Sequence, residues 1–363
     1  IEELADASLD EGYEQWYRNH CETIGGLALQ KNLSFPYQPT ISLVLPLYKE
    51  DMCYVPAALL ALSQQTYSAF ELVVLDCGID EKAFDHAFSK WHEDERFVHI
   101  VADSSLEEAA ARVSGMMQSK GEACAILDPR IILAPEALFE YVRCLNKLNA
   151  RSSLSAGDDS EKASYIVYAN HDYFDREKGF HNPQIKPIFS PDLLYSYFYA
   201  GPLVLYSKEL IEAVSQGFST DAFEYDLMLK ASLKADSIER IDKVLYHVQD
   251  AACISAEAEK IEARREEEAF RLGRKALALF LRRRHIEAVV LSEIAQRRYQ
   301  VKYRLPESRP TLSIIIPIKD EIELLDTCLS SLVEHDTLDR CEFVILQQRN
   351  TWQTLIASCP MYV

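Results

Sequence analysis

Short apolar runs alternate with amphipathic stretches along most of the chain after residue 40. The apolar runs predict strands, and the stretches between them repeat apolar residues with helical spacing. The predicted strands are Ile41–Leu47, Glu71–Asp76, Phe97–Val101, Glu122–Asp128, Ala163–Ala169 and Ile238–His247. The predicted helices are Tyr54–Gln65, Glu81–Trp91, Leu106–Lys120 and Phe223–Leu233. This alternation is typical of an α/β fold with a mostly parallel sheet covered by helices on both faces.

Four segments depart from the alternation. Residues 1–40 are helical in character and end at two prolines, and Arg151–Lys162 is a polar stretch that predicts a loop. Farther along, Ser255–Arg284 predicts a long, charged helix, and Ala288–Tyr303 predicts an extended, hairpin-like segment.

The first pattern returns about 270 positions later. Leu312–Glu321 (LSIIIPIKDE) repeats Ile41–Glu50 (ISLVLPLYKE), with Pro317 at the position of Pro46, and a helix and a second strand follow in both copies. A repeat with this spacing indicates tandem domains, and the second copy holds only one strand–helix–strand unit. We therefore predict a helical N-terminal segment, an α/β domain, a helical and extended linker and an incomplete second α/β domain, at residues 1–40, 41–254, 255–308 and 309–363.

Composition narrows the class of protein. The 57 acidic and 38 basic side chains give a formal charge of −19, which argues against non-specific nucleic-acid binding but leaves a nucleotide ligand open. No apolar run is long enough to span a bilayer, and the N-terminus does not resemble a signal peptide. The nine cysteines include no Cys-x-x-Cys pair, so we expect free thiols in a cytoplasmic protein, with contact at the inner face of the membrane left open.

Polar residues follow three of the predicted strands. Ligands of parallel sheets bind beyond the carboxyl ends of the strands, which makes Tyr48, Asp76 and Asp128 candidate ligand contacts. A carboxylate at the position of Asp76 can accept hydrogen bonds from a uracil or thymine imide and from ribose hydroxyls. Alternatively, Asp76 forms a turn before the next helix.

The motifs, taken together, resemble those of family-2 glycosyltransferases with a GT-A fold, especially bacterial tandem-domain members that build rhamnan, O-antigen and capsule-like polysaccharides. The matching motifs are Pro46-Leu-Tyr48-Lys-Glu50, Gln65-Thr-Tyr67, Asp76-Cys-Gly-Ile-Asp80, Ala110-Ala-Arg112-Val-Ser-Gly115, Lys186–Leu194 and Lys243-Val-Leu-Tyr-His247.

The resemblance implies a UDP- or dTDP-linked sugar donor and a glycan or lipid-linked acceptor. The residues implied in nucleotide and donor binding are Pro46, Tyr48, Glu50, Asp76, Arg112, Asp128, Arg130 and Gly201. Gly201 matches a glycine that lets the backbone approach the donor sugar. His247 matches a histidine near the diphosphate and the metal.

The metal-binding motif departs from the family pattern. The expected Asp-x-Asp is Asp128-Pro-Arg130 in this chain, so the second carboxylate is replaced by a guanidinium. Mg²⁺ or Mn²⁺ could still bind to Asp128 and His247, because such ions need few protein ligands beside phosphates and waters. Arg130 could instead neutralise the diphosphate without a metal, or it could be a salt-bridged loop residue in a protein that binds no donor.

The catalytic motifs depart as well. Glu224 aligns with the family's catalytic aspartate and keeps the carboxylate on a side chain one methylene longer, whereas Asp226 reads as a structural helix residue. On the acceptor side, Tyr168-Ala-Asn-His-Asp172 replaces Tyr-Ser-Asp-Glu-Asp, which keeps Asp172 and loses two carboxylates.

Two hypotheses of function follow. The chain is an inverting glycosyltransferase of cell-surface polysaccharide synthesis with Glu224 as base, or an inactive pseudo-glycosyltransferase that binds a glycan, a nucleotide or a partner enzyme. A third, in which a further C-terminal domain is the active one, stays open. The second copy carries Gln347 where the first has Asp76, so we assign it no activity.

Overall fold

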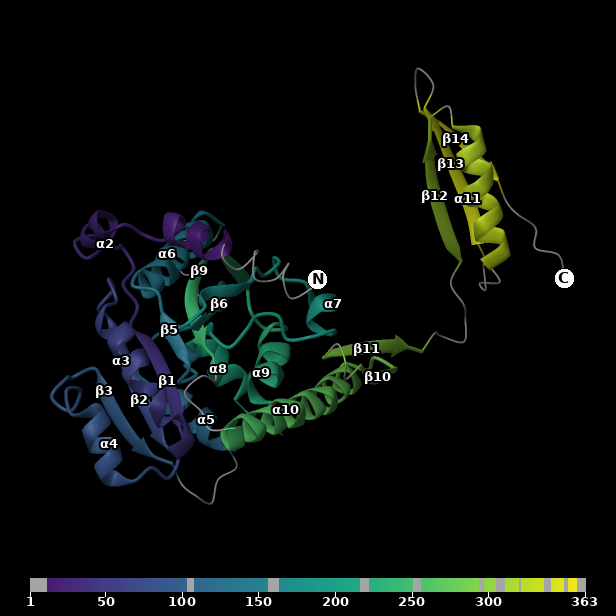
Figure 1. Ribbon diagram of the computed structural model, residues 1–363. Helices are drawn as coiled ribbons and strands as arrows, with labels where there is room; N and C mark the ends of the chain where they lie inside the picture. Colours follow the sequence, from purple (N-terminus) through teal and green to yellow (C-terminus); the bar gives the residue numbers. More distant parts are fainter. Residues whose placement is uncertain are drawn as a thin grey trace. The chain divides into compact units, whose positions relative to one another are not determined.

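The computed structural model describes residues 12–102, 108–155, 163–215, 222–250, 256–293, 295, 297–304, 311–319, 321–335, 341–348 and 352–357. The chain divides into two compact units, Ile1–Lys302 and Tyr303–Val363 (Figure 1). The helix and the hairpin that the sequence predicts as a linker lie within the first unit, apart from Tyr303 at the end of the hairpin.

A nine-stranded sheet forms the centre of the first unit, in the order β3-β2-β1-β4-β8-β6-β9-β5, with β7 paired to β6. Its strands are β1 (Ile41–Leu47), β2 (Phe70–Asp76), β3 (Phe97–Val101), β4 (Ala123–Ile126), β5 (Ile131–Leu133), β6 (Tyr165–Asp175), β7 (Gly179–Gln184), β8 (Val204–Ser207) and β9 (Ser237–Gln249). Strands β1, β2, β3, β4, β6 and β9 run in one direction, and β5, β7 and β8 run in the other. The predicted mostly parallel sheet is confirmed.

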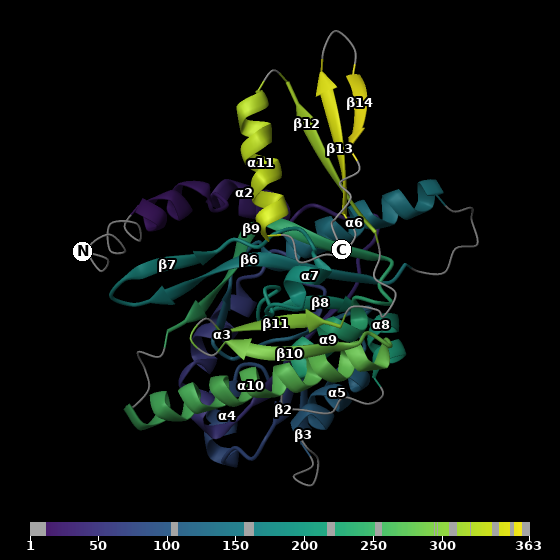
Figure 2. The ribbon, with the colours of Figure 1, turned by 90° about the vertical axis from the view of Figure 1, so that its right-hand side faces the viewer.

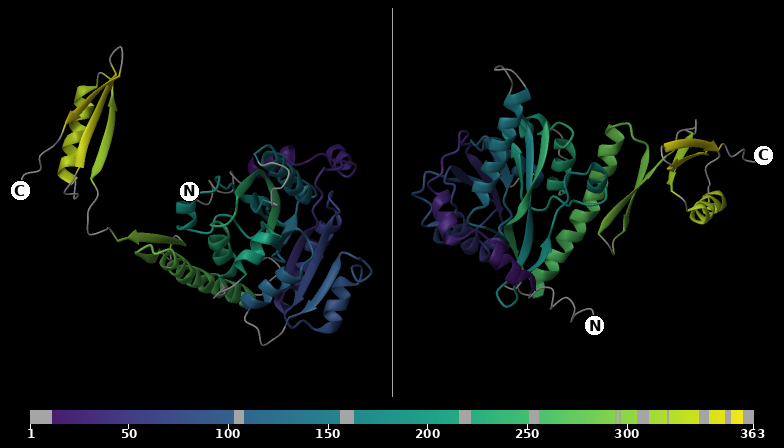
Figure 3. Two further views of the ribbon diagram at one scale, coloured as in Figure 1. Left: turned by 180° about the vertical axis from the view of Figure 1, so that it is seen from behind. Right: turned by 90° about the horizontal axis from the view of Figure 1, so that it is seen from above.

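Helices cover both faces of this sheet (Figures 2 and 3). Residues 12–20 are helical, and the further helices are α2 (Ile24–Gln30), the 3₁₀ helix η1 (Lys49–Cys53), α3 (Val55–Ser63), α4 (Glu81–Phe88), α5 (Glu108–Gln118), α6 (Ala137–Ser155), α7 (Pro191–Leu194), α8 (Lys208–Val214), α9 (Phe223–Ala231) and α10 (Ala256–Arg283). The predicted loop at 151–162 is wrong for residues 151–155, which continue α6. Arg151 there donates to Glu239 of β9 at 2.8 Å, which ties this last turn to the sheet. Residues 156–162 lie outside the described part.

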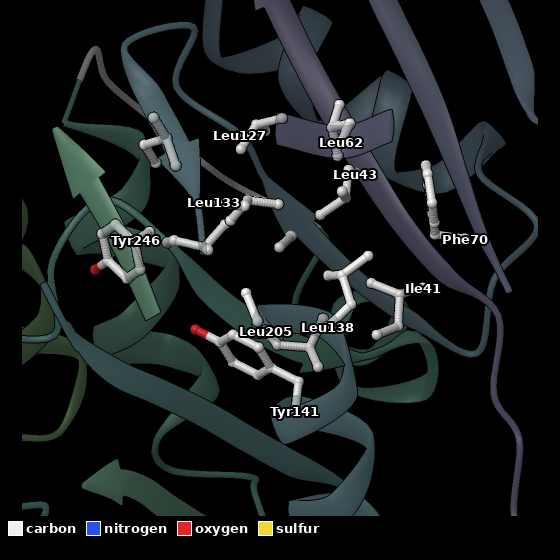
Figure 4. Close-up of a cluster of buried hydrophobic side chains, with 14 of the residues drawn as sticks. Ile41, Leu43, Leu62, Phe70, Leu127, Leu133, Leu138, Tyr141, Leu205 and Tyr246 are labelled. Atoms are coloured by element: carbon white, nitrogen blue, oxygen red, sulfur yellow. The ribbon is translucent and has the colours of Figure 1, made fainter. Parts of the chain in front are cut away.

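The apolar side chains of the strands pack into two separate cores, because successive side chains point to opposite faces of the sheet. In β1, for example, Leu43 and Leu45 join the core beneath α3, α4 and α6, whereas Val44 joins the core beneath α5, α8, α9 and α10. Figure 4 shows side chains of β1, β5, β9 and α6 meeting in the first of these cores. Each fully buried Leu or Ile contributes about 1.5–3 kcal/mol, so the doubly buried strands are the most strongly specified elements.

The register of the sheet brings the strand ends together. Leu47 of β1 pairs with Asp76 of β2, and Val44 pairs with Ile126 of β4, so the residues after these strands share one edge. On β6 and β9, which run in the same direction, Asp172 pairs with His247. This carboxyl edge is where α/β sheets bind their ligands.

A hairpin of β10 (Ala288–Glu293) and β11 (Arg298–Tyr303) follows α10 and packs against it. Tyr299 of β11 stacks on Phe270 of α10 with 4.7 Å between the ring centroids. A side chain at Gly273 would meet the Tyr299 hydroxyl at 2.3 Å, so this glycine lets the ring lie close to the helix. The predicted hairpin is confirmed.

The second unit repeats the start of the first in detail. It contains β12 (Leu312–Ile318), α11 (Ile322–His335), β13 (Cys341–Gln348) and β14 (Trp352–Ala357). Pro317 pairs with Leu346 across the parallel strands β12 and β13, as Pro46 pairs with Leu75 in the first unit. A Ser313–Glu342 hydrogen bond of 2.5 Å repeats the Ser42–Glu71 bond of 2.6 Å.

Two features distinguish the copies. In the second unit Ile318 pairs with Gln347, as Leu47 pairs with Asp76 in the first. The predicted replacement of the aspartate by glutamine therefore falls at the equivalent register position. Strand β14 then pairs antiparallel with β13, whereas β3 pairs parallel with β2. In neither unit does a described helix have the length and apolar character needed to cross a bilayer.

Candidate active site at the carboxyl edge of the sheet

Asp76 builds the turn that follows β2. Its Oδ1 accepts hydrogen bonds from the backbone N–H groups of Gly78 at 3.0 Å and Ile79 at 2.8 Å. Gly78 has a φ of +95°, which a glycine adopts without strain. The other oxygen, Oδ2, lies 3.4 Å from His99 Nε2. These bonds support the turn-forming interpretation of Asp76, and its contact with a nucleotide stays a prediction.

The Pro46–Glu50 motif spans the end of β1 and the start of η1. Pro46 is buried within the strand, Tyr48 is half-buried at the N-cap of η1, and Glu50 is exposed in its first turn. The Tyr48 N–H donates to Asp51 at 3.1 Å, which fixes the turn above the sheet edge. The motif adjoins the Asp76 turn, because the Cys77 N–H donates to the Leu47 carbonyl at 3.0 Å.

Asp128 and Arg130 form a two-point ion pair in the turn between β4 and β5. Arg130 Nε donates to Asp128 Oδ1 at 3.1 Å, and Nη2 donates to Oδ2 at 2.9 Å. The Arg130 backbone N–H also donates to Oδ1 at 2.8 Å. The guanidinium therefore covers both oxygens of the carboxylate that the family pattern assigns to the metal.

Glu224 and Arg112 face each other from two helices. Glu224 lies in the first turn of α9, where the helix dipole favours a carboxylate, and Arg112 lies on α5. Arg112 Nε is 3.8 Å from Glu224 Oε1, and the side chains are 16% and 34% exposed. By contrast, Asp226 is buried and pairs with Lys230 one turn later at 2.5 Å, as expected for a structural helix residue.

Asp172 and His247 form a buried hydrogen-bonded pair beneath the N-terminal helix at 12–20. His247 Nδ1 bonds Asp172 Oδ1, and Tyr13 donates to the other carboxylate oxygen at 2.8 Å. The Tyr17 hydroxyl lies 3.0 Å from His247 Nε2. Because a carboxylate only accepts, Nδ1 carries the proton, and in the neutral ring Nε2 accepts from Tyr17. Burial raises the pKa of both Tyr13 and Tyr17, so both phenols keep their protons.

The residues of the expected metal site do not fit a divalent ion as they are arranged. Arg130 already holds both oxygens of Asp128, and Asp172 and Tyr17 take the two ring nitrogens of His247. The described residues also contain no group of three or more His, Cys, Asp or Glu side chains suited to a metal. We therefore derive no chemical step through a metal.

Gly201 lies directly over a buried lysine. It has a φ of +85°, and a Cβ there would be 2.5 Å from Lys186 Nζ. Lys186 donates to the Ala200 carbonyl and to the Tyr246 hydroxyl, both at 2.6 Å, and no described carboxylate pairs with it. Burial lowers the pKa of Lys186 well below its ordinary value.

His171 occupies the position of the lost glutamate in the Tyr168–Asp172 motif. Its ring stacks on Tyr246 at 5.0 Å with an interplanar angle of 9°, and its Nδ1 has no hydrogen-bond partner among the described residues. Burial, with the nearby Lys186 and His247, lowers the pKa of His171 to about 3. The residue is therefore a neutral ring at physiological pH.

Sequence reasoning missed several of these partners. Lys186 belongs to a recognised motif but was assigned no role, and His99 and the tyrosines of the first helix were not placed at the site. The Tyr13–Tyr17 spacing of four residues puts both rings on one helix face, which is the one signal in the sequence that could have suggested a cover. Nothing in the sequence indicates which buried groups that face would meet.

Comparison with known proteins gives relatives over most of the chain. It is 27% identical over 330 residues to the O-antigen biosynthesis protein RfbC of Myxococcus xanthus, covering 90% of this chain and 24% of RfbC. It is 24% identical over 316 residues to the uncharacterized protein y4gI of Sinorhizobium fredii, covering 85% of this chain and 33% of y4gI. It is 27% identical over 100 residues to an uncharacterized glycosyltransferase of Haemophilus influenzae, covering 28% of this chain and 40% of that protein. The chain thus spans less than half of each of these relatives. No protein-family profile matches the sequence.

Among solved structures, S. aureus TarS 1-349 aligns with a TM-score of 0.47 and 17% identity over 65% of each chain. The Pyrobaculum calidifontis mannosyltransferase PcManGT, in complex with GDP-Man and Mn²⁺, aligns with a TM-score of 0.44 and 17% identity over 74% of this chain and 73% of that one. The sequence relatives confirm the resemblance that the motifs predict: this chain is similar to a bacterial protein of O-antigen biosynthesis and to a bacterial glycosyltransferase.

Proposed function

We propose that the first unit is an inverting glycosyltransferase that transfers a sugar from a UDP- or dTDP-linked donor to a glycan or lipid-linked acceptor in cell-surface polysaccharide synthesis. The observation that carries the proposal is the Arg112–Glu224 pair, with 3.8 Å between Nε and Oε1. This pair places a carboxylate that can act as a base, Glu224, next to a cation that can bind phosphate, Arg112. The two residues come from separate family motifs. The sequence relatives support the same class of reaction.

The chemistry assigns a role to each charged group. Glu224 accepts the proton of the acceptor hydroxyl as its oxygen attacks the anomeric carbon from the face opposite the leaving group. The bond from that carbon to the diphosphate oxygen breaks, and negative charge develops on the nucleotide diphosphate. Arg112 and Arg130 neutralise this charge, since the planar guanidinium suits phosphate oxygens. Asp128 holds Arg130 in place when no diphosphate is bound.

Release of free nucleotide tests the proposal. A panel of UDP- and dTDP-sugars is incubated with the full chain and crude lipid-linked glycan as acceptor, with Mn²⁺ in one series and a chelator in the other. We expect release in both series, loss of release with Glu224→Gln, and unchanged donor binding by calorimetry. Glu209→Gln, on the exposed surface of α8, is the matched control. Absence of nucleotide binding in both series would contradict the proposal.

A second candidate is a binding module without transferase activity. It is favoured by the engagement of two expected site carboxylates: Asp128 is held by Arg130, and Asp172 is buried with His247. Such a module would bind a nucleotide or a glycan and release no product. Donor binding without release for every donor and acceptor tested would support this candidate over the enzyme.

A further inference from the structure

An open cavity of about 310 Å³ with polar and apolar lining lies between the β10–β11 hairpin and the segment formed by α7 and the residues after it; α7 and the hairpin run close to each other in Figures 1 and 2. Its lining residues all belong to the first unit: Leu193, Ser196, Tyr197, Glu293, Arg298, Tyr299 and Gln300. The volume is at the lower end of the range for small-molecule sites. Neither the sequence motifs nor the proposed donor chemistry uses this cavity.

The aromatic walls of the cavity are held in place by the surrounding structure. The Tyr299 N–H donates to the Ser196 carbonyl at 2.7 Å, and its hydroxyl donates to Phe270 at 2.8 Å. On the other wall, the Arg298 guanidinium lies over the Tyr197 ring at 5.7 Å from the centroid. The hairpin is therefore joined to the residues that follow α7 by a backbone hydrogen bond and a cation–π contact, and the cavity between them is preformed.

The lining has the chemistry of a neutral polyhydroxyl ligand. Arg298 and Glu293 are of opposite charge, so the cavity does not favour an anion such as a nucleotide diphosphate. A pyranose ring has an apolar C–H face that packs on an exposed aromatic surface, which the half-buried Tyr197 ring offers here, and a rim of hydroxyls that both donate and accept. Arg298, Glu293 and Gln300 supply the complementary donors and acceptors.

The cavity adjoins the helix that carries the candidate base. Tyr299 stacks on Tyr225, the neighbour of Glu224, with 5.7 Å between the ring centroids. The Tyr225 hydroxyl donates to the Leu194 carbonyl at 2.7 Å, next to the lining residue Leu193. From these contacts we infer that the α7–hairpin cavity binds a sugar unit of the acceptor glycan. This inference rests on the proposed function for the identity of its ligand as acceptor.

Ligand-observed saturation-transfer NMR on the full chain tests the inference, with methyl glycosides of neutral hexoses and 6-deoxyhexoses as probes. We expect saturation transfer to at least one glycoside, and at least about a tenfold loss of its affinity with Arg298→Ala. Gln300→Trp, which fills the cavity instead of emptying it, is expected to have the same effect. Both residues are exposed, so both variants are expected to fold. Lys302→Ala, exposed on the same hairpin and outside the cavity, is the control.

Absence of transfer to every glycoside, or equal affinity in wild type, Arg298→Ala and Gln300→Trp, would overturn the inference. Calorimetry with uridine and thymidine diphosphates separates it from the proposed function. Glycoside binding that depends on Arg298, without any nucleotide binding, would retain the sugar site and refute the transferase. Nucleotide binding and turnover that are insensitive to both cavity variants would retain the transferase and refute the acceptor subsite.

Discussion

His171 makes the stability of the first unit depend on pH in a direction that the structure fixes. Burial is the main cause of its lowered pKa of about 3, and Coulombic interactions with Lys186 and His247 add to it. The ordinary value of 6.5 applies to the unfolded chain. As the pH falls below 6.5, the unfolded state takes up a proton that the folded state does not accept. Stability is therefore complete above pH 6.5 and falls below it, until the folded state also binds the proton near pH 3.

The size of the effect follows from this difference. Between the two pKa values, each unit by which the pH falls lowers the free energy of unfolding by about 1.4 kcal/mol for one proton. From pH 6.5 to pH 5 the loss is about 2 kcal/mol, a substantial fraction of the 5–15 kcal/mol typical of a folded domain. His171→Phe keeps an aromatic ring against Tyr246 and removes the titrating group, so we expect the variant to avoid this loss.

Urea denaturation at pH 7.5 and pH 5, followed by tryptophan fluorescence, measures the effect. The quantity of interest is the loss in wild type minus the loss in His171→Phe, because subtraction removes the contributions of groups common to both proteins. We expect a difference of about 2 kcal/mol. Equal losses in the two proteins would refute a buried, neutral His171.

Three further changes test the site. Glu224→Asp restores the family residue. We nevertheless expect about a hundredfold loss of nucleotide release, because the shorter side chain no longer brings the carboxylate to the acceptor hydroxyl. Full activity of this variant would show that the extra methylene is not required. Arg130→Asp recreates the Asp-x-Asp pattern with Asp128, and we expect diphosphate binding in calorimetry to become dependent on Mn²⁺, whereas metal-independent binding would contradict the role of the guanidinium. Gly201→Ala is expected to destabilise the unit by about 1–3 kcal/mol in thermal unfolding, because φ is +85° and the Cβ would be 2.5 Å from Lys186 Nζ, and an unchanged midpoint would contradict the contact.

The sheet was largely predictable from the sequence because burial on both faces leaves a simple signal. Ile41–Leu47 has the same bounds in prediction and structure, since the residues of this strand pack into one core or the other. The internal repeat was also predictable from the sequence. In the structure, Pro317 pairs with Leu346 in the register in which Pro46 pairs with Leu75. One predicted boundary failed at residues 151–155, where α6 continues into a stretch of loop-like composition and Arg151 pairs with Glu239 of β9.

The pairing of the site residues could not be predicted, because it depends on tertiary contacts. The motifs assigned Arg112 to the nucleotide and Glu224 to the acceptor, but no local pattern indicates that these side chains face each other. Asp172 and His247 are likewise assigned to different tasks by the resemblance, and they are hydrogen-bonded in the structure. Sequence motifs identify chemical groups, whereas the fold decides which of them act on one another.

Three departures from the family pattern, at Arg130, Asn170 and His171, share one electrostatic direction. Replacing the second carboxylate of the metal motif by Arg130 changes the formal charge at that position from −1 to +1, a gain equal to the charge of Mg²⁺ or Mn²⁺. Asn170 and His171 remove two more carboxylates from the same edge, beside Lys186, which has no carboxylate partner among the described residues. A divalent ion added at Asp128 would meet a carboxylate already paired with a guanidinium, and its desolvation would be poorly compensated. The substitutions therefore favour a site in which fixed guanidinium groups, and not a bound ion, provide the positive charge for a diphosphate.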